Sequence, residues 1–315
     1  MKVLPNREGK AFQEAGGSAG QCGGSLLALL HGLKWAASVD NYLVAPGISL
    51  HAVDGTAIGR LYNQLCVKEG IDDGEPFGYE VCVRFQPTDE EPHFLNFGDP
   101  YSAVDRLSNV LAIVTGRPVG MCRAIWSQGD SESVQRTELV YTIRGQTEFL
   151  EGTWPDLSDR TLRDVSTAWN NQQLAWRHAK GKSRVVNALT YFYYAWQSHY
   201  ADQICLNLAI VLELVFAPHS QSETTHQIAY NLSRFYGESR LERERIYRFT
   251  KRFYRYRSKV VHGGIPDDGA LIGAVVEGFP LVAGVLRKIL TNEILLLKID
   301  DDEARKGMLD EFLFE

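Results

Sequence analysis

The chain has 315 residues, a formal net charge of −6 at pH 7, and a composition that is 44% hydrophobic and 23% charged. This balance excludes a disordered, collagen-like or low-complexity protein, and the length allows one large domain or two ordinary ones. Taken alone, the negative charge weighs against a nucleic-acid partner, because binding to phosphates favours a basic surface.

Three further features narrow the class of protein. The first residues lack the apolar core of a secretory signal. The longest apolar stretch, residues 270–299, contains charged side chains and Pro280, so we expect buried helices and no membrane partner. The five cysteines are scattered without metal-ligand spacing. We therefore expect reduced thiols in a cytoplasmic protein with no metal and no cofactor.

The first half of the chain has a mixed pattern. In chain order, the patterns predict a helix over 25–35, a strand over 79–85, a helix over 102–115 and a strand over 138–144. Turn-rich segments separate these elements. Residues 1–157 are therefore interpreted as a mixed α+β domain.

The second half is predicted to be almost entirely helical. The expected helices span residues 160–178, with Ser158 as the cap, then 185–198, 202–216, 224–236, 240–262 and 270–297. We expect the last of these to be kinked or split at Pro280, and an acidic segment, 300–303, to precede a short tail. Short connections favour a helical bundle over residues 158–315, so the fold class predicted for the whole chain is α+β.

The helix predicted over residues 240–262 concentrates the positive charge. It contains nine basic and two acidic residues, a net charge of +7, whereas the rest of the chain, with 24 basic and 37 acidic residues, carries −13. Five aromatic residues are interleaved with these cations. Such a pattern suits an RNA strand, whose phosphates meet the cations and whose bases stack on rings. The alternative is a solvated basic face with an aromatic stripe in the core.

The end of this helix reads Arg257-Ser258-Lys-Val-Val-His262-Gly263. It resembles the Arg-x4–6-His motif of ribonucleases in the HEPN superfamily, and more closely the Arg-Ser-x-x-apolar-His-Gly motif of the ApeA-like HEPN branch. Residues 186–196 and 207–216 resemble the first two helices of that branch, with Glu213-Leu214 at its Glu-Leu position. The resemblance covers about residues 184–297.

The resemblance implies a metal-independent endoribonuclease that cuts RNA, with tRNA among the candidates, by attack of a ribose 2′-OH. It further implies a bacterial anti-phage effector or toxin that acts by abortive infection. The motifs of two protomers would share a composite cleft in a homodimer. The first domain would then respond to an unidentified trigger ligand or phage protein.

The residue types suit this chemistry. A histidine such as His262 can transfer the proton as base or acid, and the guanidinium of Arg257 can stabilise the phosphorane. Five helical positions subtend about 140°, so we expect His262 to lie at a bent helix end, which the glycines that follow permit.

Supporting roles are assigned to neighbouring residues, each with an alternative. Ser258 would bind phosphate or orient Arg257, or is an ordinary exposed serine. Glu213 would pair with Arg257 and orient it, or forms a structural ion pair. Lys259, Arg255 and Arg252 would hold the RNA backbone, or form a solvated face. For the whole chain, the alternatives are a non-catalytic HEPN interaction or dimerisation module and an RNA-binding sensor that does not cut.

Overall fold

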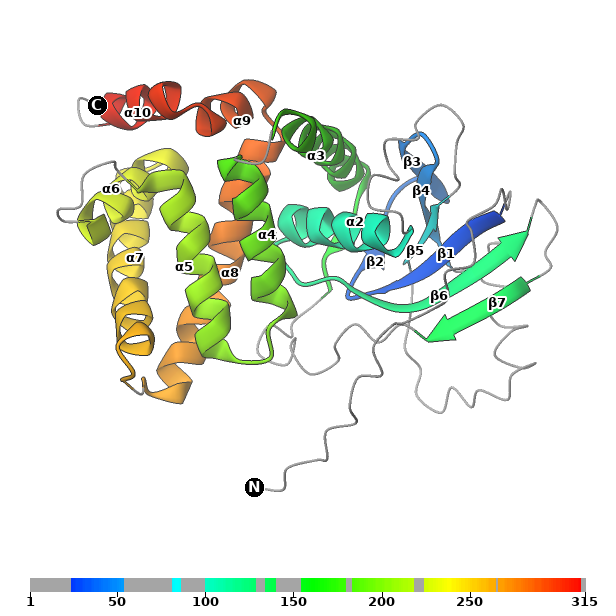
Figure 1. Cartoon of the computed structure of the whole chain (residues 1–315), viewed down its shortest axis with the longest axis horizontal. Helices are drawn as coiled ribbons and strands as arrows, with labels where there is room; N and C mark the ends of the chain where they lie inside the picture. The colour runs from blue at the N-terminus through cyan, green and yellow to red at the C-terminus, as the bar shows by residue number, and fades with distance from the viewer. Residues whose placement is uncertain are drawn as a thin grey trace.

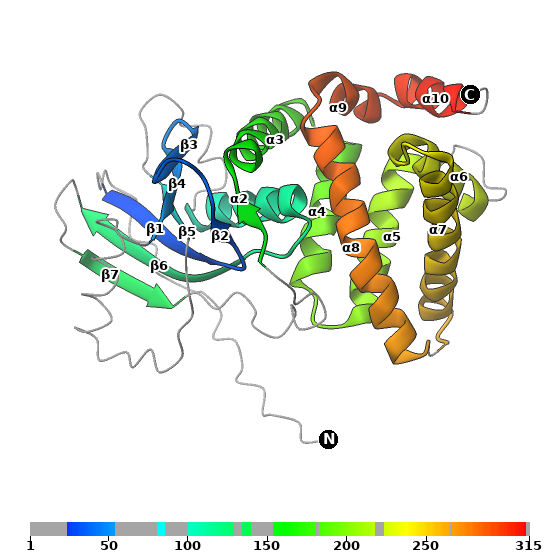
Figure 2. The same cartoon turned by 180° about the vertical axis from the view of Figure 1, so that it is seen from behind.

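The computed structural model describes residues 24–53, 81–85, 100–128, 134–139, 154–179, 183–217, 224–264 and 266–312. These residues form an antiparallel sheet in the N-terminal part of the chain and a larger helical region after it (Figure 1). The same two parts are seen from behind in Figure 2. The predicted α+β class is confirmed.

The sheet has six strands, and every neighbouring pair is antiparallel. Its spatial order is β3 (Asn41–Ala45), β4 (Ile48–Ala52), β5 (Val81–Phe85), β1 (Gly24–His31), β6 (Gly120–Gln128) and β7 (Val134–Leu139). A separate parallel pair joins β2 (Lys34–Trp35) to β8 (Asp156–Leu157). The strand predicted over 79–85 is present as β5, whereas only residues 138–139 of the other predicted strand fall in β7. Residues 140–144 lie outside the described residues.

The helix predicted over residues 25–35 is wrong, because this segment forms β1 and β2. Strand β1 pairs with β5 on one side and with β6 on the other. Ala28, Leu29 and Leu30 are fully buried, as in a strand covered on both faces, where the apolar run is continuous instead of alternating. Gly32 then adopts a φ of +90° and ends the element.

The predicted helices after residue 100 are present, most with ends shifted by one or two residues, and the segment expected over 270–297 forms two helices. They are α2 (Pro100–Thr115), α3 (Asp159–His178), α4 (Arg184–Gln197), α5 (Ala201–Phe216), α6 (Thr224–Tyr236), α7 (Arg240–Val261), α8 (Asp268–Leu290) and α9 (Glu293–Asp300). A further helix, α10 (Asp302–Glu311), was not predicted. Ser158 caps α3 as expected, because its side chain accepts a hydrogen bond from the backbone N–H of Thr161 at 3.3 Å.

Two expectations for the C-terminal part need correction. Of the two outcomes expected at Pro280, a split is wrong, because α8 continues through this residue, and a kink stays a prediction. The break comes later, where Asn292 caps α9 by accepting the N–H of Leu295 at 3.0 Å. The segment after residue 300 is not a short tail but forms α10. The acidic segment contributes to helix packing, because Asp300 accepts hydrogen bonds from the hydroxyl of Ser183 and from the N–H of Val185 at the start of α4.

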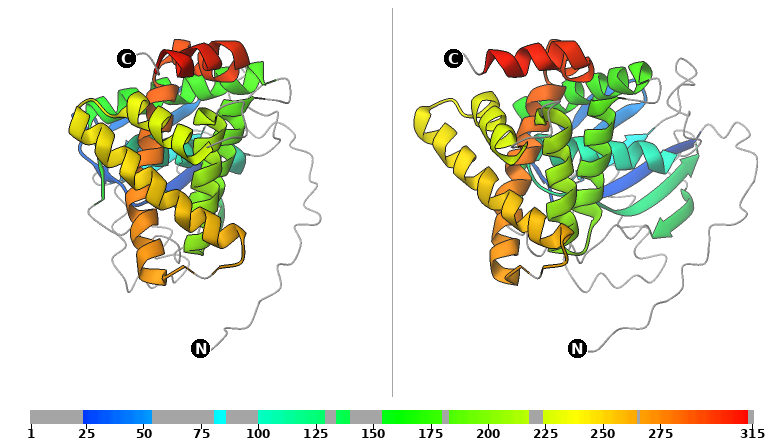
Figure 3. Two further views of the ribbon diagram at one scale, coloured as in Figure 1. Left: turned by 90° about the vertical axis from the view of Figure 1, so that its left-hand side faces the viewer. Right: turned by 60° about the vertical axis from the view of Figure 1, so that its left-hand side comes forward.

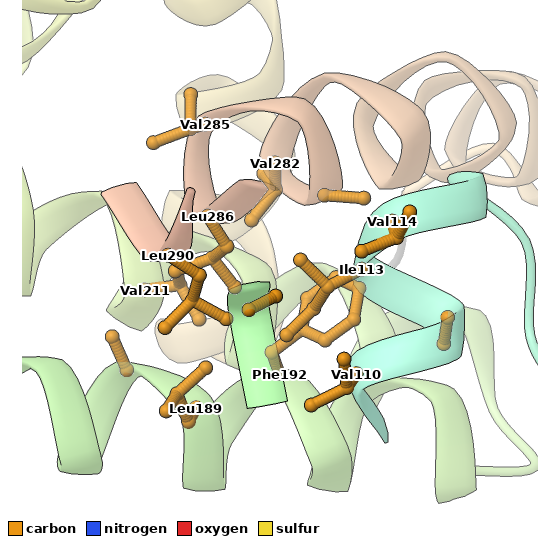
Figure 4. Packing of buried hydrophobic residues seen from close by; sticks show 14 of the residues in the cluster. Val110, Ile113, Val114, Leu189, Phe192, Val211, Val282, Val285, Leu286 and Leu290 are labelled. Carbon is orange, nitrogen blue, oxygen red and sulfur yellow. The ribbon is translucent and has the colours of Figure 1, made fainter. Parts of the chain in front are cut away.

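A single hydrophobic core runs from the sheet into the bundle. It includes sheet residues such as Val83 and bundle residues such as Phe192 and Leu286, and Figure 4 shows its central part around Phe192. Helix α2 contacts the sheet and also α3, α4 and α8. Arg287 of α8 ties this junction together, because its guanidinium donates to the carbonyl of Val114 at 3.1 Å and pairs with Asp164.

Helix α8 is long and apolar enough to cross a membrane by length and composition, and it is the one such helix among the described residues. Half of that apolar window is buried inside the protein. The helix contacts α2, α3, α5, α7 and α9, which is the pattern of a central core helix.

Candidate functional site

The buried face of α7 accounts for most of its aromatic residues. This helix lies beside α6 at the end of the molecule opposite the sheet, and it faces the viewer in the left panel of Figure 3. Its core positions recur at helical spacing and are Ile246, Phe249, Thr250, Phe253 and Tyr254. Three of the five aromatic residues that could have stacked on bases are therefore in the core, and only Tyr247 and Tyr256 remain partly exposed.

The opposite face of α7 carries a basic stripe, defined here as Arg248, Lys251, Arg252, Arg255 and Lys259. All five side chains are exposed, and the spacing of three or four residues keeps them on one face that leads to His262. Arg248 pairs with Glu244, and Arg252 pairs with Glu277 at 2.5 Å. The other three cations form no ion pair within the described part of the chain, so they are available to an anionic ligand.

Arg257 points away from the stripe, toward α5. Its guanidinium lies 3.3 Å from Oε1 of Glu213, and about a third of each side chain is exposed. The predicted ion pair is therefore present. Burial raises the pKa of Glu213, and the charge of Arg257 opposes that shift. The carboxylate holds Arg257 at the rim of the α5–α7 contact while leaving part of the guanidinium open to solvent.

Two neutral groups complete the surroundings of this pair. The hydroxyl of Tyr254 donates to the carbonyl of Ala209 at 3.2 Å. Burial, with a further contribution from Asp202, raises the pKa of the Cys205 thiol to about 12, against the opposing effect of Arg257. Cys205 is therefore a fully buried residue in an environment that favours its protonated form.

His262 occupies the C-terminal cap of α7, at the helix end where we expected it. The N–H of Gly263 bonds to the carbonyl of Val260 at 3.2 Å, and that of Gly264 bonds to the carbonyl of Lys259 at 2.7 Å. With Gly263 at a φ of +73°, this is a Schellman motif. The N–H of His262 donates to the carbonyl of Ser258 at 3.1 Å, so the backbone position of His262 is fixed while its side chain is exposed.

A cleft of about 510 Å³ opens beside this helix end. Its walls are the turn between α4 and α5, the Gly263-Gly264 turn and the start of α8, and they include His199 and Asp202. Neither residue is a site candidate in the sequence analysis. The signal in the sequence was weak, because only the fold brings the turn near residue 200 next to the turn after His262.

The site residues predicted from the sequence thus fall into three places. Arg257 and Glu213 meet between α5 and α7, while His262 caps the end of α7, next in sequence to Gly263, which lines the cleft. Arg252, Arg255 and Lys259 lie on the basic stripe, and Ser258 is exposed at its edge. Five positions subtend about 140° around an ideal helix, so Arg257, which faces Glu213, and His262 belong to different faces of α7.

Among the described residues, no group of three or more His, Cys, Asp or Glu side chains is placed to hold a metal ion. Comparison of the chain with protein-family models, with curated proteins and with solved structures gives no match.

Proposed function

We propose that this chain is a metal-independent endoribonuclease of the HEPN type, in which Arg257 and His262 act on the scissile phosphate. The observation that carries this proposal is that both residues lie in the last two turns of a strongly basic helix, whose end lines a cleft through Val260, Gly263 and Gly264. The exposed cations of the stripe would hold the phosphates of an RNA strand and guide it toward His262. The resemblance of the motif to the ApeA-like branch adds to this argument.

The chemistry is an internal transesterification. His262 takes the proton of the ribose 2′-OH, and the 2′-oxygen attacks the phosphorus. Arg257 stabilises the extra negative charge on the phosphorane oxygens. The bond to the 5′-oxygen then breaks, and that oxygen takes a proton from a protonated histidine or from water. The products are a 2′,3′-cyclic phosphate and a free 5′-OH.

The different helix faces of the two residues favour a site shared by two protomers. About 140° separates them around an ideal helix axis, and Glu213 holds Arg257 on the α5 side. A second copy would supply the missing partner to each site. Val261, an apolar residue beside His262, is 51% exposed, which fits a surface that a second protomer covers.

The biological role proposed with this activity is abortive infection in a bacterial cytoplasm. RNA cleavage, with tRNA as a candidate substrate, would stop growth after a phage trigger reaches the N-terminal part. This role rests on the resemblance alone.

The test uses the purified full chain and a fluorescent RNA oligonucleotide. We expect cleavage by the wild type, a loss of at least a hundredfold in Arg257→Ala and His262→Ala, and none on the 2′-deoxy oligonucleotide. Arg240→Ala serves as a matched control, because Arg240 is an exposed cation at the other end of α7. Equal cleavage by all four proteins would refute the proposal. RNA binding without cleavage in the wild type would favour the RNA-binding sensor.

A second experiment tests the shared site. The solution mass should be twice the chain mass of 35.4 kDa. Mixed dimers of Arg257→Ala and His262→Ala should regain activity, because one of their two composite sites would contain both residues. Inactive mixed dimers, or an active monomer, would contradict the composite cleft.

A further inference from the structure

The cleft at the end of α7 contains side chains that the proposed proton transfer does not use. It lies where the turn between α4 and α5, the turn after α7 and the start of α8 come together, at the lower end of the bundle in Figure 1. Its volume of about 510 Å³ is within the range of roughly 300–1,000 Å³ typical of small-molecule sites. The cleft is therefore large enough to admit a nucleobase.

The charge of the lining does not suit a phosphate. The cleft is lined by the carboxylates of Asp202 and Asp268, with His199, and by no lysine or arginine from the described part of the chain. The cations lie instead on the basic stripe, which reaches the same end of α7 through Arg255 and Lys259. Carboxylates repel phosphates and accept hydrogen bonds from N–H groups. An RNA strand on the stripe would therefore keep its phosphates outside the cleft and place a base inside it.

Tyr200 offers a flat ring to such a base. Its side chain is 65% exposed although the ring is large and mostly apolar. Tyr200 occupies the N-cap position of α5, but its side chain makes no capping hydrogen bond, and it has no other side-chain partner among the described residues. Val260, Leu271 and Ile272 add apolar surface to the same cleft. A base that stacks on the ring removes apolar surface from water on both sides of the contact.

Asp268 offers acceptors to the edge of the base. It is exposed in the first turn of α8, whereas the neighbouring Asp267 is the residue that caps this helix, by accepting the N–H of Ala270 at 2.8 Å. Neither carboxylate oxygen of Asp268 has a hydrogen-bond or ion-pair partner in the described ranges. Asp202 is partly engaged, because its Oδ1 accepts the N–H of Gln203 at 2.8 Å. The open pair of acceptors in the cleft therefore belongs to Asp268.

Guanine is the base whose edge matches a carboxylate. Its N1–H and N2–H donors lie side by side and can both bond to the two oxygens of one carboxylate. Adenine and cytosine place a ring nitrogen that accepts next to their amino group, and uracil flanks its N–H with carbonyls. Each of these three bases would bring an acceptor against the carboxylate.

We propose that this cleft binds a guanine base of single-stranded RNA, with the ring stacked on Tyr200 and with N1–H and N2–H donated to Asp268. The inference rests on the proposed function, because it names the base that the same site accepts beside the scissile phosphate. Cleavage should then fall next to guanosines in unpaired segments. Tyr200 and Asp268 determine specificity and take no part in the proton transfer.

DNA oligonucleotides separate binding from cleavage, because they lack the 2′-OH that the proposed reaction needs. Fluorescence anisotropy of the full chain compares a labelled oligothymidine with the same strand carrying one central guanine, adenine or cytosine. We expect the guanine strand to bind at least about tenfold tighter than the other three at pH 7. Asp268→Asn should remove this preference, and Tyr200→Ala should weaken binding of the guanine strand at least about tenfold.

Tyr194→Ala and Glu293→Gln are the matched controls. Tyr194 is also an exposed tyrosine, and Glu293 is also an exposed carboxylate in the first turn of a helix, but neither lines the cleft. We expect both controls to bind all strands as the wild type does. Thermal midpoints near that of the wild type would show that the four variants are folded, as expected for substitution of exposed side chains.

The proposal is overturned if the four strands bind equally, if the wild type binds none of them, or if the two cleft variants behave like their controls. Guanine-dependent binding that is lost in the cleft variants, without cleavage of the matching RNA, would support the base site and refute the proposed nuclease. Cleavage of RNA without any preference for guanosine would support the nuclease and refute the base site.

Discussion

Substitution by alanine is expected to have opposite effects on stability at two glycines, Gly263 in the Schellman motif that ends α7 and Gly273 inside α8. Gly263 has a φ of +73°, and no atom lies within 4 Å of where a Cβ would be added. Alanine there meets no clash but must adopt the left-handed region, at a cost of roughly 1–2 kcal/mol. Gly273 is exposed inside α8 and equally open. Alanine there should stabilise the helix by roughly 0.5–1 kcal/mol.

Urea denaturation of the two full-length variants measures both effects against the wild type. We expect the free energy of unfolding to fall for Gly263→Ala and to rise for Gly273→Ala, with a gap of roughly 1.5–3 kcal/mol. Changes of the same sign and size would refute the argument that the end of α7 requires a glycine. If His262 acts in cleavage as proposed, Gly263→Ala should also slow cleavage, whereas Gly273→Ala should not.

Three further substitutions probe packing and charge. Arg305→Met should lower the free energy of unfolding by about 2–3 kcal/mol, because it removes a buried guanidinium that donates to the carbonyl of Ala217 at 2.8 Å. If urea denaturation shows a decrease below about 0.5 kcal/mol, this role is contradicted. Gly278→Ala places a Cβ 3.1 Å from the ring of Phe253, so overpacking of about 1–3 kcal/mol should exceed the helical gain; a stabilised variant would mean that α7 and α8 pack less tightly. Burial raises the pKa of Glu213 above 4.5, which favours its protonated form in the folded state. The stability of the wild type relative to Glu213→Gln should therefore be highest below pH 4.5 and fall as the pH rises through the raised pKa of Glu213. Urea denaturation of both proteins at about pH 4 and pH 7 measures this difference. The same difference in free energy of unfolding at both pH values would contradict the prediction.

Local signals explain why the helical part of the chain was predictable. Ser158 and the glycines at 237 and 263 lie at helix ends, and the preference of these residues for caps depends on the nearest turn of backbone. The end of α7 at His262 followed from the same local reasoning. The expected split at Pro280 does not occur, because this residue is exposed within α8 and the helix, which contacts five other helices, continues through it.

Elements that depend on distant partners were not predictable in this way. Residues 24–31 contain good helix formers, but β5 and β6, which come at least 50 residues later in the chain, make this segment the central part of the sheet. The role of Asp300 as an acceptor at the start of α4 joins residues 115 to 117 positions apart.

In the candidate site, too, local features were predictable and contacts between distant segments were not. The pair of Arg257 and Glu213 was predictable, because a carboxylate on an apolar helix needs a partner and the motif offered one. The cleft beside His262 was not, since His199 joins it only through the turn between α4 and α5. The aromatic residues of α7 were assigned in part to RNA, and three of them are instead core residues, because periodicity alone does not say which face of a helix is covered.

The continuous core around α2 has a consequence for cooperativity. Because α2 packs on the sheet and on α8 at once, neither part of the chain can lose its structure without exposing apolar surface of the other. The protein should therefore melt in a single calorimetric transition, and a chain cut between residues 157 and 158 should yield fragments that associate or aggregate when separated. A ligand that binds the folded protein at either part should therefore stabilise the whole chain, because both parts share one unfolding equilibrium.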